Sequence, residues 1–81
     1  MRIDKFLKNS RLIKRRTVAK EACDQQRVFI NGKTAKAGTE LSEGDLVHIE
    51  FGNSSLTVRV RALTESCRKE DAAGMYEIVE D

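Results

Sequence analysis

The sequence has few of the residue types that build reactive centres. It has no proline or tryptophan, one histidine, His48, and two cysteines, Cys23 and Cys67. One histidine and two isolated cysteines leave no convincing ligand set for a metal and no nucleophile paired with a base. Neither a G-x-x-x-x-G-K-[ST] nor a G-x-G-x-x-G loop occurs, so nucleotide-dependent activity has no support. We therefore expect a non-enzymatic protein with no catalytic residues, no metal and no cofactor.

Long apolar runs are also missing. Charged or polar residues interrupt every run well before the roughly 18 to 20 residues that a membrane-spanning helix needs. Asp4, Lys5 and Lys8 stand where a signal peptide would have its apolar core. Isolated cysteines are typical of reduced thiols. We expect a single small domain in the cytoplasm that contacts no membrane.

Charge of each sign is concentrated in one half of the chain. Residues 1–36 contain eleven basic and three acidic residues, which gives a formal charge of +8. Residues 37–81 contain four basic and ten acidic residues, which gives a formal charge of −6. A strongly basic half attracts polyanions such as nucleic acid. Two alternatives stay open: a solvated basic surface without a partner, and a protein-interaction module whose acidic carboxyl-terminal half docks a basic partner.

Hydrophobic periodicity predicts two helices near the amino terminus, over residues 3 to about 9 and from Arg15 or Arg16 to about residue 25. After residue 26 the period becomes alternating, which is typical of strands. Strands are expected at 27–30, 33–37, 46–51 and 56–61, followed by a short helix around 68–73 and a strand-like segment at 75–79. This order predicts an α+β fold with two helices packed on a small antiparallel sheet.

Turn residues predict how the strands pair. Asn31-Gly32 favours a two-residue type I′ hairpin turn. A four-residue loop at 52–55 would pair Phe51 with Leu56 and Ile49 with Val58, so that one face of the second hairpin is apolar. A slip of one residue would put apolar and polar side chains on the same face, which argues against registers shifted by one residue.

The aromatic residues argue against the recognition of single strands. We expect Phe6, Phe29 and Phe51 on core faces, and Tyr76 lies far from the basic half. No aromatic platform would then be available for stacking splayed bases. The chain also lacks a long helix with side chains aimed at base edges, as a reader of the DNA major groove would need. The candidate partner that remains is a folded RNA, recognised through its backbone.

The densest basic cluster lies at the expected start of the second helix. Lys14, Arg15 and Arg16 stand where cations oppose the helix dipole, and no capping residue precedes Arg16. Free amides and guanidinium groups that converge at a helix start make a strong phosphate site. We predict an RNA-binding surface formed by Arg2, Lys5, Lys8, Arg11, Lys14, Arg15, Arg16 and Lys20.

Three segments resemble the S4-type RNA-binding domain. They are IKRRTVA at 13–19, RVFING at 27–32 and EGDLVHI at 43–49. The segments MRIDKFLK at 1–8, SRLIKRRT at 10–17 and AAGMY at 72–76 extend the resemblance nearly end to end, to the RqcP family of stand-alone bacterial S4 proteins related to the fifteen-kilodalton heat-shock protein. Arg15 stands where many such domains have a Ser or Thr cap, and Gln26 where many have Gly.

The resemblance implies an S4 domain over residues 1–63 and an acidic extension over residues 64–81. It implies a ribosome-associated quality control factor that binds obstructed large ribosomal subunits through rRNA and peptidyl-tRNA. It also implies support of the partner RqcH in adding alanine tails to stalled nascent chains. Arg2 and Arg16 match family positions that touch RNA. Away from the ribosome the chain is expected to be a monomer.

Overall fold

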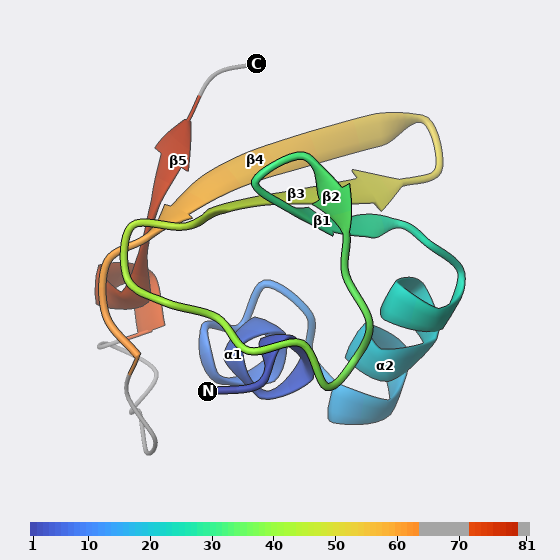
Figure 1. The fold of residues 1–81 in the computed structure, drawn as a ribbon, viewed down its shortest axis with the longest axis horizontal. Coiled ribbons are helices and arrows are strands. Elements are labelled where there is room, and N and C mark those ends of the chain that lie inside the picture. Colours follow the sequence, from blue (N-terminus) through green and yellow to red (C-terminus); the bar gives the residue numbers. More distant parts are fainter. Residues whose placement is uncertain (64–71, 80–81) are drawn as a thin grey trace.

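Two helices cover one face of a five-stranded antiparallel sheet (Figure 1). The computed structural model describes residues 1–63 and 72–79. Strand order is β2-β1-β3-β4-β5. In chain order the elements are α1 (Ile3–Asn9), α2 (Arg16–Asp24), β1 (Val28–Ile30), β2 (Lys33–Thr34), β3 (Leu46–Phe51), β4 (Ser54–Val60), the 3₁₀ turn η1 (Ala73–Met75) and β5 (Tyr76–Val79).

The predicted α+β architecture is thereby confirmed. The strand-like segment at 75–79 is present as β5, which pairs antiparallel with β4. Most of the short helix expected around residues 68–73 lies outside the described residues. The return strand predicted at 33–37 is shorter than expected, because β2 ends at Thr34 and the chain turns toward α1.

The core lies between the helical layer and the sheet. Ile3, Phe6 and Leu7 of α1 are fully buried, and Ala19 and Cys23 of α2 pack in the same cluster. The sheet contributes Val28, Val47, Ile49, Val58 and Val60. No helix within the described ranges is long and apolar enough to cross a membrane.

A turn that follows β2 caps the start of α1. The amides of Ile3 and Asp4 donate to the carbonyl oxygens of Thr39 and Ala37, at 2.9 and 3.3 Å. The Lys5 amide donates to the Asp4 carboxylate at 2.8 Å. These bonds satisfy the amides that every helix leaves unpaired in its first turn. They also fix the amino terminus of α1 against a segment more than thirty residues away in the chain.

The backbone adopts left-handed conformations at the Asn31-Gly32 turn and at the end of α2. Asn31 and Gly32 have φ of 52° and 83°, which confirms the predicted type I′ turn. Gln26 has φ of 61° at the end of α2, the position where glycine is usual. Only glycine adopts this conformation freely, so the backbone at Gln26 is strained.

The predicted register of the second hairpin is wrong by two residues. Phe51 pairs with Ser54 across a tight Gly52-Asn53 turn, and Ile49 pairs with Leu56. Because side chains alternate with a period of two, a two-residue shift keeps every side chain on its predicted face. The alternating pattern therefore specified the faces but left the loop length open.

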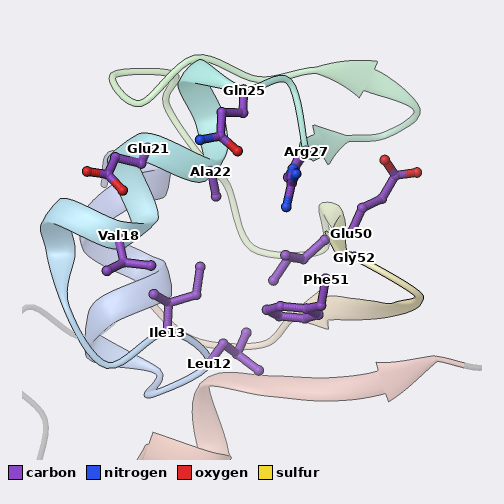
Figure 2. Close-up of a pocket in the computed structure, with 11 residues that line it drawn as sticks. Leu12, Ile13, Val18, Glu21, Ala22, Gln25, Arg27, Glu50, Phe51 and Gly52 are labelled. Carbon is purple, nitrogen blue, oxygen red and sulfur yellow. The ribbon is translucent and has the colours of Figure 1, made fainter.

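The predicted placement of Phe29 is wrong, whereas Phe51 lies on its predicted face but is not buried. Phe29 lies on the sheet face away from the helices, where its ring centroid is 5.7 Å from that of His48. Phe51 is 43% exposed and points into a groove beside α2 (Figure 2). Phe6 is buried as expected. Because Phe29 and Phe51 are not buried in the core, the argument from the aromatic residues no longer holds, and recognition of the RNA backbone stays a prediction.

Replacing Gln26 with glycine tests the strain at the end of α2. We expect Gln26→Gly to raise the free energy of unfolding by about 0.5 to 1 kcal/mol, because glycine removes the left-handed penalty of its side chain. Gln25→Gly is the matched control: at φ of −85° glycine gives no such relief and should destabilise. Urea unfolding of both variants measures the difference, and equal effects would contradict it.

Burial of Cys23 predicts an unreactive thiol. Burial, with smaller contributions from Asp4 and Asp24, raises the pKa of the Cys23 thiol from its ordinary 9.0 to about 11. Deprotonation is then easier in the unfolded chain, so the free energy of unfolding should fall as pH rises from 9 toward 11. In a Cys67→Ser background, alkylation of native protein at pH 8 should be about a hundredfold slower than that of unfolded protein. Equal rates would refute the prediction.

Candidate nucleic-acid interface

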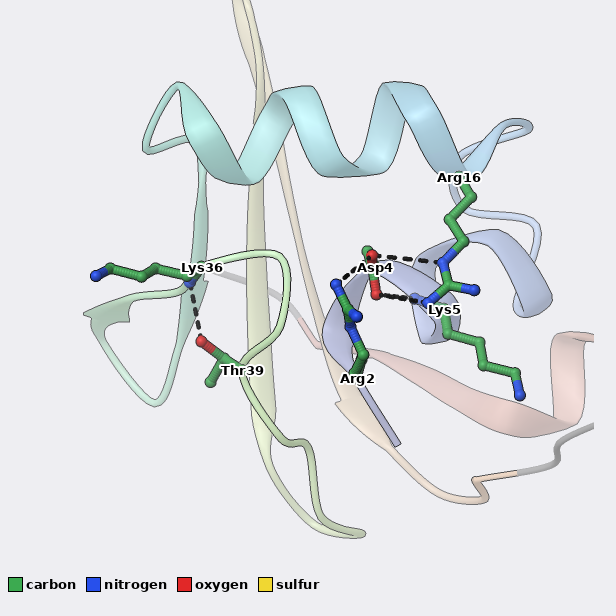
Figure 3. A network of polar contacts seen from close by, with 6 residues as sticks. All are labelled: Arg2, Asp4, Lys5, Arg16, Lys36 and Thr39. Carbon is green, nitrogen blue, oxygen red and sulfur yellow. Dashed lines mark hydrogen bonds and ion pairs between the residues drawn. The ribbon is translucent and has the colours of Figure 1, made fainter.

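A buried carboxylate lies between two arginines from different helices. Asp4 Oδ2 is 3.3 Å from Arg2 Nη2 and 3.4 Å from Arg16 Nε (Figure 3). Arg16 Nη2 also donates to Asp4 Oδ1, at 3.5 Å. The Asp4 side chain is 4% exposed, whereas both arginine side chains are 49% exposed. One carboxylate thus holds two guanidinium groups that each keep half their surface in solvent.

The local fold explains why these three residues meet. Arg2 is the residue before α1, Asp4 is in its first turn, and Arg16 is the first residue of α2. The starts of both helices therefore contribute to one site. The capping turn at residues 37–39 fixes the start of α1, and Ala19 and Cys23 bury α2 in the core.

The charges within this group do not cancel. Asp4 carries one negative charge and the two guanidinium groups carry two positive charges, so a net positive charge remains at the surface. A carboxylate this deeply buried needs its partners, because an unpaired buried charge is strongly destabilising. The pairing also restricts the long arginine side chains, which lose less freedom when they bind an anion.

The exposed predicted cations other than Arg2 and Arg16 form no ion pair with Asp4 in the described part of the chain. Lys5 is half-buried and joins the group through its amide. Arg16 and Lys20 project from the same side of α2, four residues apart. No ion pair to another described residue involves the exposed side chains of Lys8, Arg11, Lys14, Arg15 and Lys20.

The two helix starts differ in how their amides are used. At α1, backbone carbonyls from the turn at residues 37–39 accept the first hydrogen bonds. At α2, Arg15 precedes the helix in an extended conformation and its side chain makes no capping bond. The absence of a side-chain cap agrees with the sequence. The start of α2 therefore combines a helix terminus of positive potential with Arg15 and Arg16.

Two features of this surface were not predicted from the sequence. One is the pairing of Asp4 with Arg2 and Arg16, for which the sequence offers only the position of Asp4 two residues after Arg2. The turn containing Lys36 lies against Arg2, since a Cβ atom on Gly38 would be 3.8 Å from the guanidinium. The Lys36 amide donates to Thr39 Oγ1 at 2.9 Å, which closes this turn. Lys36 is exposed, and its side chain extends away from Arg2, Asp4 and Arg16 (Figure 3).

The one histidine lies on the β3–β4 hairpin. His48 Nδ1 is 2.8 Å from Thr57 Oγ1 on the neighbouring strand, and Nε2 is 3.7 Å from Glu50. The contact with Thr57 joins β3 to β4. No group of three or more potential metal ligands occurs within residues 1–63 and 72–79.

Comparison with known proteins identifies relatives of this chain. The S4 domain model matches residues 1–47. The RQC P-site tRNA stabilizing factor of Streptococcus pneumoniae is 56% identical over 100% of this chain and 92% of its own length. The factor of the same name from Halalkalibacterium halodurans is 55% identical over 96% of this chain and 89% of its own.

A solved structure shares the fold. The trimeric structure of heat shock protein 15 from Vibrio cholerae superposes with a TM-score of 0.90 at 24% identity, covering 98% of this chain and 81% of that one. The helices, the sheet and the sequence identity of the relatives lead to the same assignment. The chain belongs to the S4 domain family and, within it, to the family of RQC P-site tRNA stabilizing factors.

Proposed function

We propose that this chain stabilises P-site tRNA on obstructed large ribosomal subunits during ribosome-associated quality control. It acts without catalysis, by binding the sugar-phosphate backbones of peptidyl-tRNA and rRNA. In this role it supports RqcH-dependent alanine tailing in the cytoplasm. The residues that bind RNA are Arg2, Lys5, Lys8, Arg11, Lys14, Arg15, Arg16 and Lys20.

One observation carries the proposal: Asp4 holds the guanidinium groups of Arg2 and Arg16 side by side at the surface. Guanidinium groups bind phosphate oxygens through planar, paired hydrogen bonds. Two such groups whose orientation is set before binding can hold a backbone at a defined place. Such a contact gives position rather than sequence, and position is what stabilising a tRNA requires.

The proposal divides the chain into two parts. Residues 1–63 form the S4 domain that holds the RNA, and residues 64–81 form an acidic extension. The extension has six acidic and two basic residues, so phosphate is repelled from it. This asymmetry favours approach of the RNA to the helical side of the protein.

The salt dependence of binding tests the backbone contact. If five cations displace counterions, log affinity for large subunits carrying P-site tRNA should fall with log salt at a slope of roughly −3.5 to −4.5. Fluorescence anisotropy of labelled protein at several salt concentrations measures this slope. A slope near zero would reject binding through phosphate.

Arg16→Ala should weaken binding more than Lys20→Ala. Both variants remove one cation from the same side of α2, but Arg16→Ala also leaves Arg2 alone with Asp4, as a neutral pair. We expect Lys20→Ala to reduce the magnitude of the salt slope by about 0.7 to 0.9 and Arg16→Ala to reduce it further. Sedimentation with large subunits reports the loss directly. Equal co-migration of wild type and Arg16→Ala would contradict the assigned role.

Asp4→Asn separates positioning from net charge. The variant removes a negative charge, so an account based on net charge alone expects tighter RNA binding. We expect weaker binding, because the two guanidinium groups lose the carboxylate that pairs them. Glu40→Gln is the matched control: Glu40 bonds the terminal amino group at 3.0 Å without touching either guanidinium, and its loss should leave binding equal or tighter. Amide spectra confirm that both variants fold, and tighter binding by Asp4→Asn would refute positioning.

A further inference from the structure

The guanidinium group of Arg2 rests against a turn that lies more than thirty residues further along the chain. A Cβ atom on Gly38 would be 3.8, 3.9 and 3.8 Å from Arg2 Nε, Cζ and Nη2. Because these three distances are nearly equal, position 38 faces the plane of the guanidinium group rather than its edge. Nη2 of the same group donates to Asp4 Oδ2 at 3.3 Å. The turn therefore supports one face of the group, and the carboxylate holds one of its nitrogen atoms.

Thr39 closes this turn with both its side chain and its backbone. The Lys36 amide donates to Thr39 Oγ1 at 2.9 Å (Figure 3). The Thr39 amide donates in return to the Lys36 carbonyl oxygen, at 3.0 Å. Hydroxyl groups commonly fix tight turns by bonds of this kind to nearby backbone. Without the hydroxyl, the turn keeps only one of these two bonds.

The turn is also bonded to the backbone that follows Arg2. The Ile3 amide donates to the Thr39 carbonyl oxygen at 2.9 Å. The Asp4 amide donates to the Ala37 carbonyl oxygen at 3.3 Å. The position of the turn therefore affects Arg2 twice, through the backbone from which its side chain extends and through the surface against which its guanidinium group rests.

Closure of the turn matters more for Arg2 than for the stability of the fold. The bond to the Thr39 hydroxyl is exposed to solvent, so water can replace the hydroxyl there. Ile3 and Leu41 are buried in the core and keep the two segments attached. In a loosened turn, however, Gly38 no longer stays at a fixed distance from the guanidinium group. The arginine side chain then regains freedom that it must lose again when it binds an anion.

We propose that Thr39 is a positioning residue for RNA binding, which acts by holding Gly38 against the guanidinium group of Arg2. The inference rests on the proposed function, in which Arg2 binds phosphate. Thr39 acts through Arg2 and makes no contact with RNA itself. The direction of the Arg2 side chain is thereby set by two contacts, one with Asp4 and one with the turn.

Two substitutions of Thr39 test the role of its hydroxyl group. Thr39→Val keeps the branched shape and removes the hydroxyl, whereas Thr39→Ser keeps the hydroxyl. We expect Thr39→Val to weaken binding to large subunits carrying P-site tRNA about three- to tenfold, which is the usual effect of one hydrogen bond. Thr39→Ser should restore affinity to within about twofold of wild type. Fluorescence anisotropy measures both, and equal affinities of the two variants would overturn the proposal.

An Arg2→Ala background separates positioning from a general structural role. There Thr39→Val should change the affinity less than about twofold, because the side chain that Thr39 positions is absent. An equal loss in both backgrounds would mean that Thr39 acts through the fold as a whole, and would refute the proposal. Thr57→Val is the matched control: it removes a hydroxyl 2.8 Å from His48 Nδ1, on the sheet face away from the helices. It should leave RNA affinity unchanged.

The side-chain NMR signal of Arg2 reports its order without RNA. In the ¹⁵N-labelled full chain, the Nε–Hε signal of Arg2 is identified by its absence from Arg2→Ala. We expect its heteronuclear Overhauser effect to fall in Thr39→Val and to be retained in Thr39→Ser and Thr57→Val. An effect that is unchanged in Thr39→Val would show that the turn does not order the arginine, and the proposal would be wrong.

Failure of this proposal can be distinguished from failure of the proposed function. If Arg2→Ala weakens RNA binding but Thr39→Val does not, the RNA-binding role of Arg2 stands and only the positioning role of Thr39 is refuted. If Arg2→Ala binds large subunits as tightly as wild type, the assigned role of Arg2 is wrong, and positioning by Thr39 fails with it.

Discussion

The contact of one buried carboxylate with two guanidinium groups determines where the fold places positive charge at the surface. Asp4 can lie below the surface because the α1 terminus is capped from the turn after β2, and because Arg2 and Arg16 compensate its charge. Removing one partner from a buried charge is costly, so the arrangement is held together by all three residues. A positive charge remains exposed at a position that the core determines.

The small size of the domain limits where it can form a binding site. A chain of 81 residues has little interior from which to build a deep pocket. Its charged surface and its apolar groove lie instead at the edges of the helical layer. On one side of α2 the cations project, and on the other the layer ends short of the β3–β4 hairpin and leaves an apolar groove. One helix of nine residues thereby separates two surfaces of different chemistry.

The sequence predicted most of the architecture, because hydrophobic periodicity and turn residues are local signals. The two helices, the Asn31-Gly32 turn, the first four strands and the strand-like carboxyl-terminal segment follow from such signals. The register of the second hairpin did not follow from local signals, since shifts of two residues leave the alternating pattern unchanged. Phe51 lies on its predicted face but is exposed, because a strand pattern gives the face of a side chain and not whether another layer covers it. The role of Asp4 requires knowing that the starts of two helices meet, which no local pattern contains.

A double-mutant cycle tests most directly whether Arg2 and Arg16 act as one unit. Binding free energies to large subunits carrying P-site tRNA are compared for wild type, Arg2→Ala, Arg16→Ala and the double variant. If Asp4 aligns both groups on one backbone, the double variant should lose clearly less than the sum of the two single losses, by more than about 0.5 kcal/mol. Losses that add within that margin would mean that the two arginines bind independently, and would contradict the account.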